Sequence, residues 1–149
     1  MGLFRRLLGG QAFDDRPIKP QRLDYLNEAL ALERQGDFEA ALTSYRLALR
    51  DKPSDARILQ SMAIAFTKTG QTDEAIRHYR RALQVDDTLS GAHYGLAFRL
   101  KAKGDLAEAA QHLKAFLSRP PKGPDADRWV QHAEAALREI ETEAAPESS

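Results

Sequence analysis

Cysteine is absent from all 149 residues of the sequence. The chain therefore has no disulfide framework, no thiol nucleophile and no thiolate ligand for zinc. It also lacks any apolar run near the roughly 18 residues that a membrane-spanning helix needs. Because a protein without disulfides suits a reducing compartment, we expect a cytoplasmic protein whose membrane contact, if any, is peripheral.

An excess of charge of either sign is missing as well. The sequence has 22 Lys and Arg residues against 22 Asp and Glu residues. This balance creates no overall field that would attract nucleic acid, so we expect no nucleic-acid partner. A hydrophobic share of 42% with a mean hydropathy of -0.54 indicates one compact domain with short tails.

A period of 34 residues runs through the middle of the chain, and glycines mark it at Gly36, Gly70 and Gly104. Apolar residues recur at helical spacing on both sides of each glycine, which predicts two helices per unit. The predicted units are residues 22–55, 56–89 and 90–123. The same spacing relates the sets Ala29, Ala63 and Ala97; Ala41, Ala75 and Ala109; and Leu49, Leu83 and Leu117.

Each unit contains residues that end one helix and begin the next. The glycine ends the first helix because only glycine adopts the left-handed backbone there without a steric penalty. Asp37 and Asp105 follow directly and are predicted to cap the second helix, and Asp105 with Glu108 has the spacing of a capping box. Pro53 and Pro121 stop the second helix.

The three units resemble the tetratricopeptide repeat (TPR) family over about residues 22–123. The resemblance implies an all-α fold, a right-handed TPR superhelix (α-solenoid) of about seven antiparallel helices. Four positions depart from the family pattern: Glu28, Asp87, His93 and Phe116. The residues that match it are Tyr25, Ala29, Leu32, Ala41, Tyr45, Ala48 and Pro53 in the first unit; Leu59, Met62, Ala63, Phe66, Ala75, Tyr79 and Ala82 in the second; and Leu96, Ala97, Leu100, Ala109, Leu113 and Pro121 in the third.

A further helix is predicted over residues 124–141, where Ala126, Trp129, Val130, Ala133, Leu137 and Ile140 share one apolar face. A helix with a polar back covers the exposed apolar end of a solenoid. We expect Trp129 to pack in the core against Phe116 rather than to belong to a ligand site. Residues 142–149 are predicted to be a disordered tail.

Residue sets typical of enzymes are not found. The acidic pairs, such as Asp73-Glu74 and Asp86-Asp87, are explained by helix starts and loops, where carboxylates bind free backbone N–H groups. His78 and His112 share a repeat position and are predicted to lie on the outer surface, with no further ligand at metal-binding spacing. We therefore expect no enzyme, no catalytic residue, no cofactor and no metal site.

The resemblance also implies a concave groove lined by the first helix of each pair. An apolar stripe bordered by cations suits a peptide or amphipathic helix that is apolar with some acidic residues. The resemblance thus implies a non-catalytic scaffold or adaptor for protein–protein interaction. For Leu26 the alternative is packing between helices. The positions that face the groove hold Leu26 and Leu30 in the first unit, Arg57, Gln60, Ile64 and Lys68 in the second, and Tyr94, Phe98 and Lys101 in the third.

One TPR subgroup binds the terminal carboxylate of chaperone tails through Lys, Asn and Arg side chains. The corresponding positions here hold Leu26, Leu30, Ser61, Gly91 and Gly95. None of these residues can supply the charge or amide of that clamp, so we do not expect chaperone tails to bind.

The segment 1–21 is a separate amphipathic element followed by a linker with two prolines; its apolar residues are Leu3, Phe4, Leu7 and Leu8, and its cations Arg5 and Arg6. Burying the four apolar side chains yields roughly 6–12 kcal/mol. Ordering the backbone costs about 8–16 kcal/mol, so the segment alone should bind weakly. We expect a flexible tail or partner-binding peptide. Insertion into the chain's own groove, weak membrane attachment and self-assembly into a homo-oligomer are open alternatives.

Overall fold

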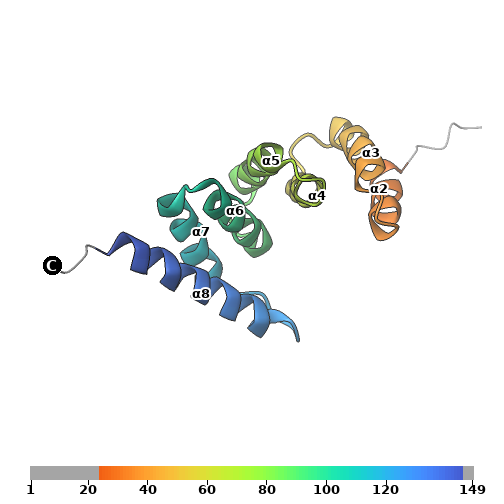
Figure 1. Cartoon of the computed structure of the whole chain (residues 1–149). Coiled ribbons are helices and arrows are strands. Elements are labelled where there is room, and N and C mark those ends of the chain that lie inside the picture. Colours follow the sequence, from red (N-terminus) through yellow and green to blue (C-terminus); the bar gives the residue numbers. More distant parts are fainter. Residues whose placement is uncertain (1–23, 146–149) are drawn as a thin grey trace, which may run out of the picture.

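A curved row of helices forms the fold in the computed structural model, which describes residues 24–145 (Figure 1). Each helix packs against its neighbours in the chain, and α4 also contacts α6. The predicted all-α fold of antiparallel helices is confirmed. The described residues form seven helices: α2 (Tyr25–Arg34), α3 (Phe38–Asp51), α4 (Ala56–Lys68), α5 (Thr72–Val85), α6 (Ser90–Lys103), α7 (Leu106–Ser118) and α8 (Ala126–Ala144).

Left-handed glycines join the two helices of each pair. The φ angles of Gly36, Gly70 and Gly104 are 79°, 78° and 86°. The residue after each glycine donates its backbone N–H to a carbonyl five residues earlier. These bonds join Asp37 to Leu32 at 2.9 Å, Gln71 to Phe66 at 2.8 Å and Asp105 to Leu100 at 3.0 Å. The predicted role of the glycines in ending the first helices is therefore confirmed.

Aspartate side chains cap three of the helices. Asp24, Asp37 and Asp55 accept hydrogen bonds from backbone N–H groups in the first turns of α2, α3 and α4. The Asp105 side chain makes no such bond to α7, so the predicted capping box with Glu108 is wrong. Glu108 instead binds Arg80 of α5, with 2.7 Å between Oε2 and Nη2, which holds its carboxylate away from the start of α7.

Repeated alanines let the paired helices approach closely. The repeated alanines are 0% exposed, and they lie in one hydrophobic core that runs along the row of helices. Tyr45, Tyr79 and Leu113 occupy one equivalent position and are nearly fully buried. The Tyr45 hydroxyl donates to Glu33 Oε2 at 2.6 Å. Burial raises the pKa of Tyr45, and the Glu33 carboxylate raises it further. The buried alanines are Ala29, Ala63 and Ala97 on first helices and Ala41, Ala75 and Ala109 on second helices.

Helix α8 packs on the third helix pair through Ala133, Ala136 and Ile140. It extends to Ala144, so the predicted end at residue 141 is too early and residues 142–144 are helical rather than disordered. The helix continues because backbone bonds persist and the Thr142 hydroxyl donates to the Arg138 carbonyl at 2.8 Å. The predictions for residues 1–21 and 146–149 lie outside the described residues.

No helix within residues 24–145 combines the length and the apolar character needed to cross a membrane.

Candidate functional site

A groove of about 620 Å³ lies between the first helices α4 and α6 and the start of α8. Most of its lining is apolar. Its charged side chains are Lys68 and Arg99, both cationic, so no carboxylate of residues 24–145 lines it. The lining residues are Gln60, Ile64, Thr67, Lys68, Tyr79, Ser90, Gly91, Tyr94, Gly95, Phe98, Arg99, Phe116, Pro121, Trp129 and His132.

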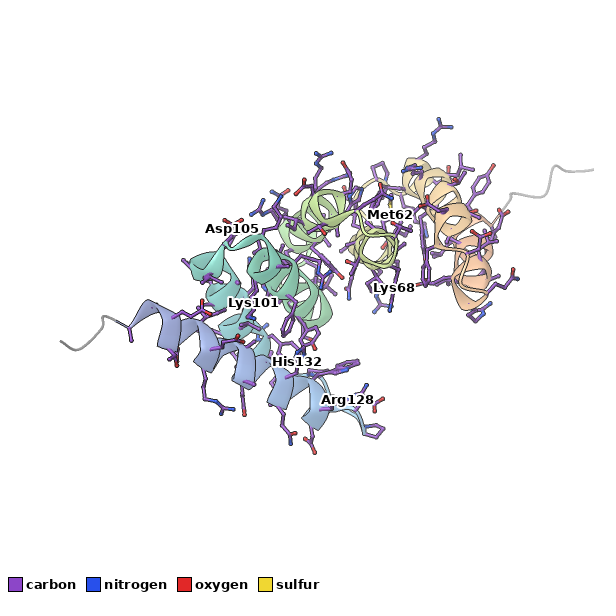
Figure 2. All side chains as sticks on the ribbon, in the orientation of Figure 1. Met62, Lys68, Lys101, Asp105, Arg128 and His132 are labelled. Carbon is purple, nitrogen blue, oxygen red and sulfur yellow. The ribbon has the colours of Figure 1, made fainter. Side chains whose placement is uncertain are left out.

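Five of the nine side chains that the sequence placed in a groove meet in this lining. They are Gln60, Ile64, Lys68, Tyr94 and Phe98. They come from α4 and α6, the first helices of the second and third pairs. Figure 2 shows Lys68 on the side of the helix row that faces the start of α8.

The other four predicted groove residues lie outside this lining. Leu26 borders a separate cleft of about 430 Å³ between α2, α3 and α4. Leu30 is half-buried and packs against the core, and Arg57 is exposed in the first turn of α4. The Nζ atom of Lys101 lies 3.1 Å from Glu139 Oε2 of α8, so this cation is already paired. The described groove is therefore shorter than the predicted stripe.

Aromatic rings from α6 and α8 form one wall of the groove. The Tyr94 ring centroid lies 4.7 Å from that of Phe98 and 5.1 Å from that of Phe116. His132 stacks on Phe98 at 4.3 Å with an interplanar angle of 8°. Its Nδ1 atom lies 2.6 Å from the Tyr94 hydroxyl, which donates when the neutral imidazole carries its proton on Nε2. The wall thus joins two helices that are distant in sequence.

Trp129 belongs to this groove, so its predicted burial in the core is wrong. Its side chain is 41% exposed, and its ring centroid lies 6.3 Å from that of Tyr94. The first turn of α8 extends past the third helix pair (Figure 1). Trp129 lies in this turn and stays partly exposed. Helical periodicity gave the correct face of α8 but not how far that helix overhangs its neighbours.

Two glycines of α6 let side chains of the groove lining pack directly against the helix backbone. A Cβ atom on Gly95 would lie 2.3 Å from Cζ of Tyr79, and one on Gly91 would lie 2.6 Å from Nε2 of Gln60. Tyr79 and Gln60 therefore lie directly against the α6 backbone. Burial raises the pKa of Tyr79 and also that of Tyr94, so both hydroxyls stay protonated near neutral pH.

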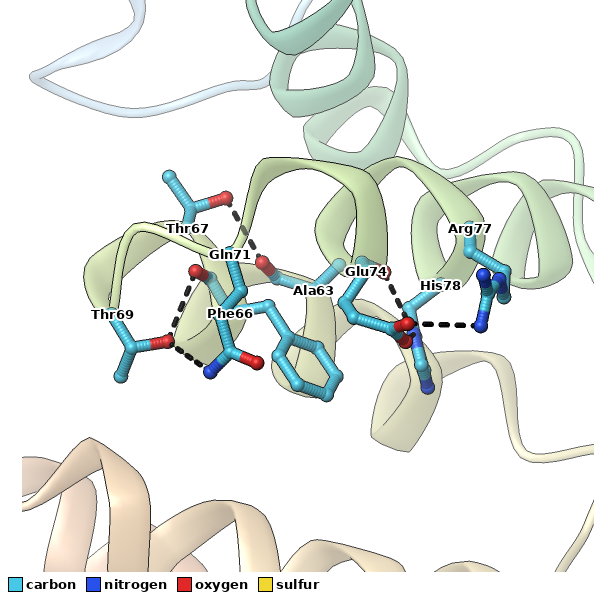
Figure 3. Close-up of polar contacts among 8 residues, drawn as sticks. All are labelled: Ala63, Phe66, Thr67, Thr69, Gln71, Glu74, Arg77 and His78. Atoms are coloured by element: carbon cyan, nitrogen blue, oxygen red, sulfur yellow. Dashed lines mark hydrogen bonds and ion pairs between the residues drawn. The ribbon is translucent and has the colours of Figure 1, made fainter.

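His78 is buried, which corrects its predicted place on the outer surface. Its side chain lies 4.8 Å from the Phe66 ring, centroid to centroid, and it is 7% exposed. The Nδ1–H group donates to the Glu74 carbonyl at 2.8 Å (Figure 3). Burial lowers the pKa of His78 because the charged ring would lose hydration. Packing against α4, which repeat position alone did not indicate, explains the difference.

His112 is half-buried and contacts His93 of α6 rather than standing on the outer surface. The two Nδ1 atoms are 3.0 Å apart, and His93 Nε2 lies 2.8 Å from the Asp87 carbonyl. A carbonyl only accepts, so His93 carries its proton on Nε2 and its Nδ1 accepts from His112. Burial lowers the pKa of His112, and His93 lowers it further. Within residues 24–145 no three side chains are grouped as metal ligands.

Comparison with known sequences identifies the repeat. Two family models, both described as Tetratricopeptide repeat, match residues 26–93 and 66–136. The photosystem I assembly protein Ycf3 of Parasynechococcus marenigrum is 30% identical over 115 residues, which are 75% of this chain and 61% of that protein. The peroxisomal targeting signal receptor of Eremothecium gossypii is 33% identical over 82 residues, which are 55% of this chain and 14% of the receptor. The chain thus spans only part of either relative.

Solved structures share the fold. The Yersinia enterocolitica type III secretion chaperone SycD, in complex with a peptide of the translocator YopD, aligns with a TM-score of 0.74 at 21% identity. This alignment covers 81% of the chain and 92% of SycD. The second TPR domain of human RPAP3, in complex with the HSP70 peptide SGPTIEEVD, gives a TM-score of 0.66 at 20% identity. This alignment covers 78% of the chain and 92% of the RPAP3 domain.

Proposed function

Because the chain belongs to the tetratricopeptide repeat family, we propose that it is a non-catalytic scaffold that binds a peptide or amphipathic helix of a partner protein. The proposed binding site is the groove between α4, α6 and α8. The observation that carries the proposal is the wall of partly exposed aromatic rings, Tyr94, Phe98 and Trp129, beside the cations Lys68 and Arg99. Aromatic surface that stays accessible in a concave site marks a binding surface more often than a structural one.

The lining favours a partner segment in which bulky apolar side chains alternate with acidic ones. Apolar side chains of the partner would cover the aromatic wall, and Lys68 and Arg99 would attract its carboxylates. The same cations argue against the chain's own residues 2–8 as the occupant, because Arg5 and Arg6 carry charge of the same sign.

Two proteins of the same fold support the class of ligand. SycD is described in complex with a peptide of YopD, and RPAP3 with a peptide of HSP70. The RPAP3 ligand ends in the acidic motif EEVD. The carboxylate-clamp positions of this chain include Gly91 and Gly95, whose missing side chains are replaced by close contacts of α6 with Gln60 and Tyr79. We therefore expect weak binding of EEVD tails and a different peptide preference.

Replacement of Trp129 by alanine should reduce peptide binding at least tenfold, because truncating a large aromatic anchor costs roughly 2 kcal/mol or more. Stability should change little because the ring is 41% exposed. Peptides selected by the wild-type chain from a random phage library serve as probes, and fluorescence anisotropy measures their affinity. Selection should enrich sequences that combine apolar and acidic residues.

Val85→Ala is the matched control. Val85 is also a large exposed side chain, at 49%, but it lies at the end of α5 outside the groove. This variant should bind the selected peptides as the wild type does. Equal affinity of Trp129→Ala and wild type, or a library that yields no enriched sequence, would refute the groove as the binding site.

A further inference from the structure

A second cleft, of about 390 Å³, lies between the second helices α3 and α5 and shares no lining residue with the groove. Arg46 and Arg50 border it on α3, and His78 and Arg81 border it on α5. Its base is formed by side chains of α4, among them Phe66, which is 2% exposed.

The charges around this cleft are unbalanced. Among the described residues, Glu74 is the one carboxylate in its lining, and this group already binds Arg77, with 2.9 Å between Oε1 and Nη1. Within residues 24–145, Arg46, Arg50 and Arg81 make no ion pair with any carboxylate. Three guanidinium groups therefore border one cleft in which the Glu74 carboxylate is bound by Arg77 instead.

Neighbouring cations on the same side behave differently. Arg80 binds Glu108 at 2.7 Å, and Lys103 binds Asp73 at 2.6 Å. Of the three arginines of α5, Arg77 and Arg80 are therefore paired, whereas Arg81 makes no ion pair within the described residues. Arg46, Arg50 and Arg81 thus bring unpaired positive charge together at the α3–α5 cleft, although the sequence as a whole carries no net charge.

The cleft rests on a rigid base. The Arg46 guanidinium carbon lies 5.9 Å above the Phe66 ring centroid, within cation–π range. Phe66 in turn packs on buried His78, whose ring is fixed by its hydrogen bond to the Glu74 carbonyl (Figure 3). A guanidinium group that is held in place loses less freedom when it binds a ligand, which favours recognition.

We propose that the α3–α5 cleft binds an acidic segment of a second partner protein, so that the scaffold holds two partners on two different surfaces. Guanidinium groups bind carboxylates through paired, charge-assisted hydrogen bonds, and three of them suit a run of Asp and Glu residues. A membrane surface fits less well, because the cations line a recess and the surrounding pairs, Arg80 with Glu108 and Lys103 with Asp73, are neutral.

The test uses the full chain and a short fluorescein-labelled peptide of Glu, Asp and Gly, which has no apolar side chain for the aromatic groove, beside a matched peptide of Gln, Asn and Gly. Wild type should bind the acidic peptide, and the affinity should fall as ionic strength rises. The variant Arg46→Gln/Arg50→Gln/Arg81→Gln should bind it at least tenfold more weakly, because each hydrogen bond to a charged group contributes on the order of a tenfold factor. Circular dichroism confirms that the variant is folded.

A second variant, Lys114→Gln/Arg119→Gln/Arg138→Gln, removes the same charge from exposed positions of the α7–α8 end of the chain. It should bind the acidic peptide as wild type does, and so should Trp129→Ala, which tests the groove alone. Amide chemical shifts should move at Phe66 and His78 on titration. The proposal fails if the two charge variants lose affinity equally, if the neutral peptide binds as well, or if the shifts move at Tyr94 instead. Vesicles of anionic lipid are the last probe. If the wild type binds these vesicles but not the acidic peptide, and the arginine variant loses that vesicle binding, the proposal is also overturned.

Discussion

At the scale of single residues, Gly95 determines how closely α5 and α6 approach beneath the groove. A Cβ atom there would meet the ring of Tyr79, which is 4% exposed and cannot move away. At Gly91, in the same helix, a Cβ atom would meet only the end of the Gln60 side chain, which can rotate. The two glycines therefore differ in what an added methyl group displaces.

Gly95→Ala should lower the free energy of unfolding by about 1–3 kcal/mol, because overpacking against Tyr79 outweighs the gain in helix propensity. Gly91→Ala should instead be neutral or raise it by up to about 1 kcal/mol. Urea unfolding followed by circular dichroism measures both variants. Equal effects at the two positions would show that Tyr79 does not restrict the approach of α6.

Buried histidines should make stability depend on pH. The folded-state pKa values of His78 and His112 lie below their ordinary value of 6.5, mainly because of burial. The unfolded chain therefore binds more protons at mildly acidic pH, and the free energy of unfolding falls as the pH drops below about 6.5. Thermal unfolding between about pH 7.5 and 5.5 should show this loss.

In His78→Gln the loss of stability on acidification should be smaller than in wild type, since one of the two groups no longer titrates. Gln131→Ala is the control, because Gln131 is exposed on α8 and its side chain does not titrate. A His78→Gln variant with an unchanged pH profile would show that His78 does not contribute.

At the scale of elements, the sequence predicted the helices better than it predicted their mutual coverage. The 34-residue period located each helix pair because glycine at positive φ and buried alanine are local requirements of the joint and of the contact between helices. Burial of His78 and exposure of Trp129 depend on neighbouring helices, Phe66 of α4 in one case and the overhang of α8 in the other. No local sequence pattern shows how completely a neighbouring helix covers these side chains.

The residues that line the groove were likewise predicted only in part. The repeat positions correctly brought Ile64, Tyr94 and Phe98 together, since α4 and α6 are equivalent helices of successive units. They did not indicate Trp129 and His132, which lie outside the repeats on α8. In the sequence, the sign that these two residues share a site was their spacing of three positions on the predicted final helix, which places them on the same helix face.

Helix α8 should protect the third pair as well as supply part of the groove. Removal of residues 124–149 uncovers the side of the third pair that α8 packs against, near the fully buried Phe116. The truncated chain should unfold at lower temperature and associate as its concentration rises, because an exposed apolar face seeks another surface. Sedimentation velocity over a concentration series measures the association, and a chain shortened by residues 146–149 is the control. A monomeric truncated chain of unchanged stability would contradict this role of α8.

At the scale of the whole molecule, contacts run almost entirely between helices that follow one another in the chain. Stability in such a row is a sum of helix and nearest-neighbour terms, so it need not be uniform. Helices α4, α5 and α6 have neighbours on both sides, whereas α8 packs on the described part of the chain mainly through α7.

Hydrogen exchange measured by mass spectrometry should therefore be slowest in α4, α5 and α6 and faster in α2 and α8. The free chain is the sample, at neutral pH and without peptide. A common exchange rate in all seven described helices would mean that the row unfolds as one cooperative unit.

The same left-handed glycine turn joins the two helices of every pair, so a 34-residue unit can be added to the chain as a whole. Every joint uses the same positive φ and the same backbone hydrogen bond from the residue after the glycine. A duplicate of residues 56–89 would enter the row in phase, and it would lengthen the concave surface by one more first helix without disturbing the joints on either side. An insertion of any other length would rotate all later helices out of phase. The binding surface can therefore change in length only by whole 34-residue units.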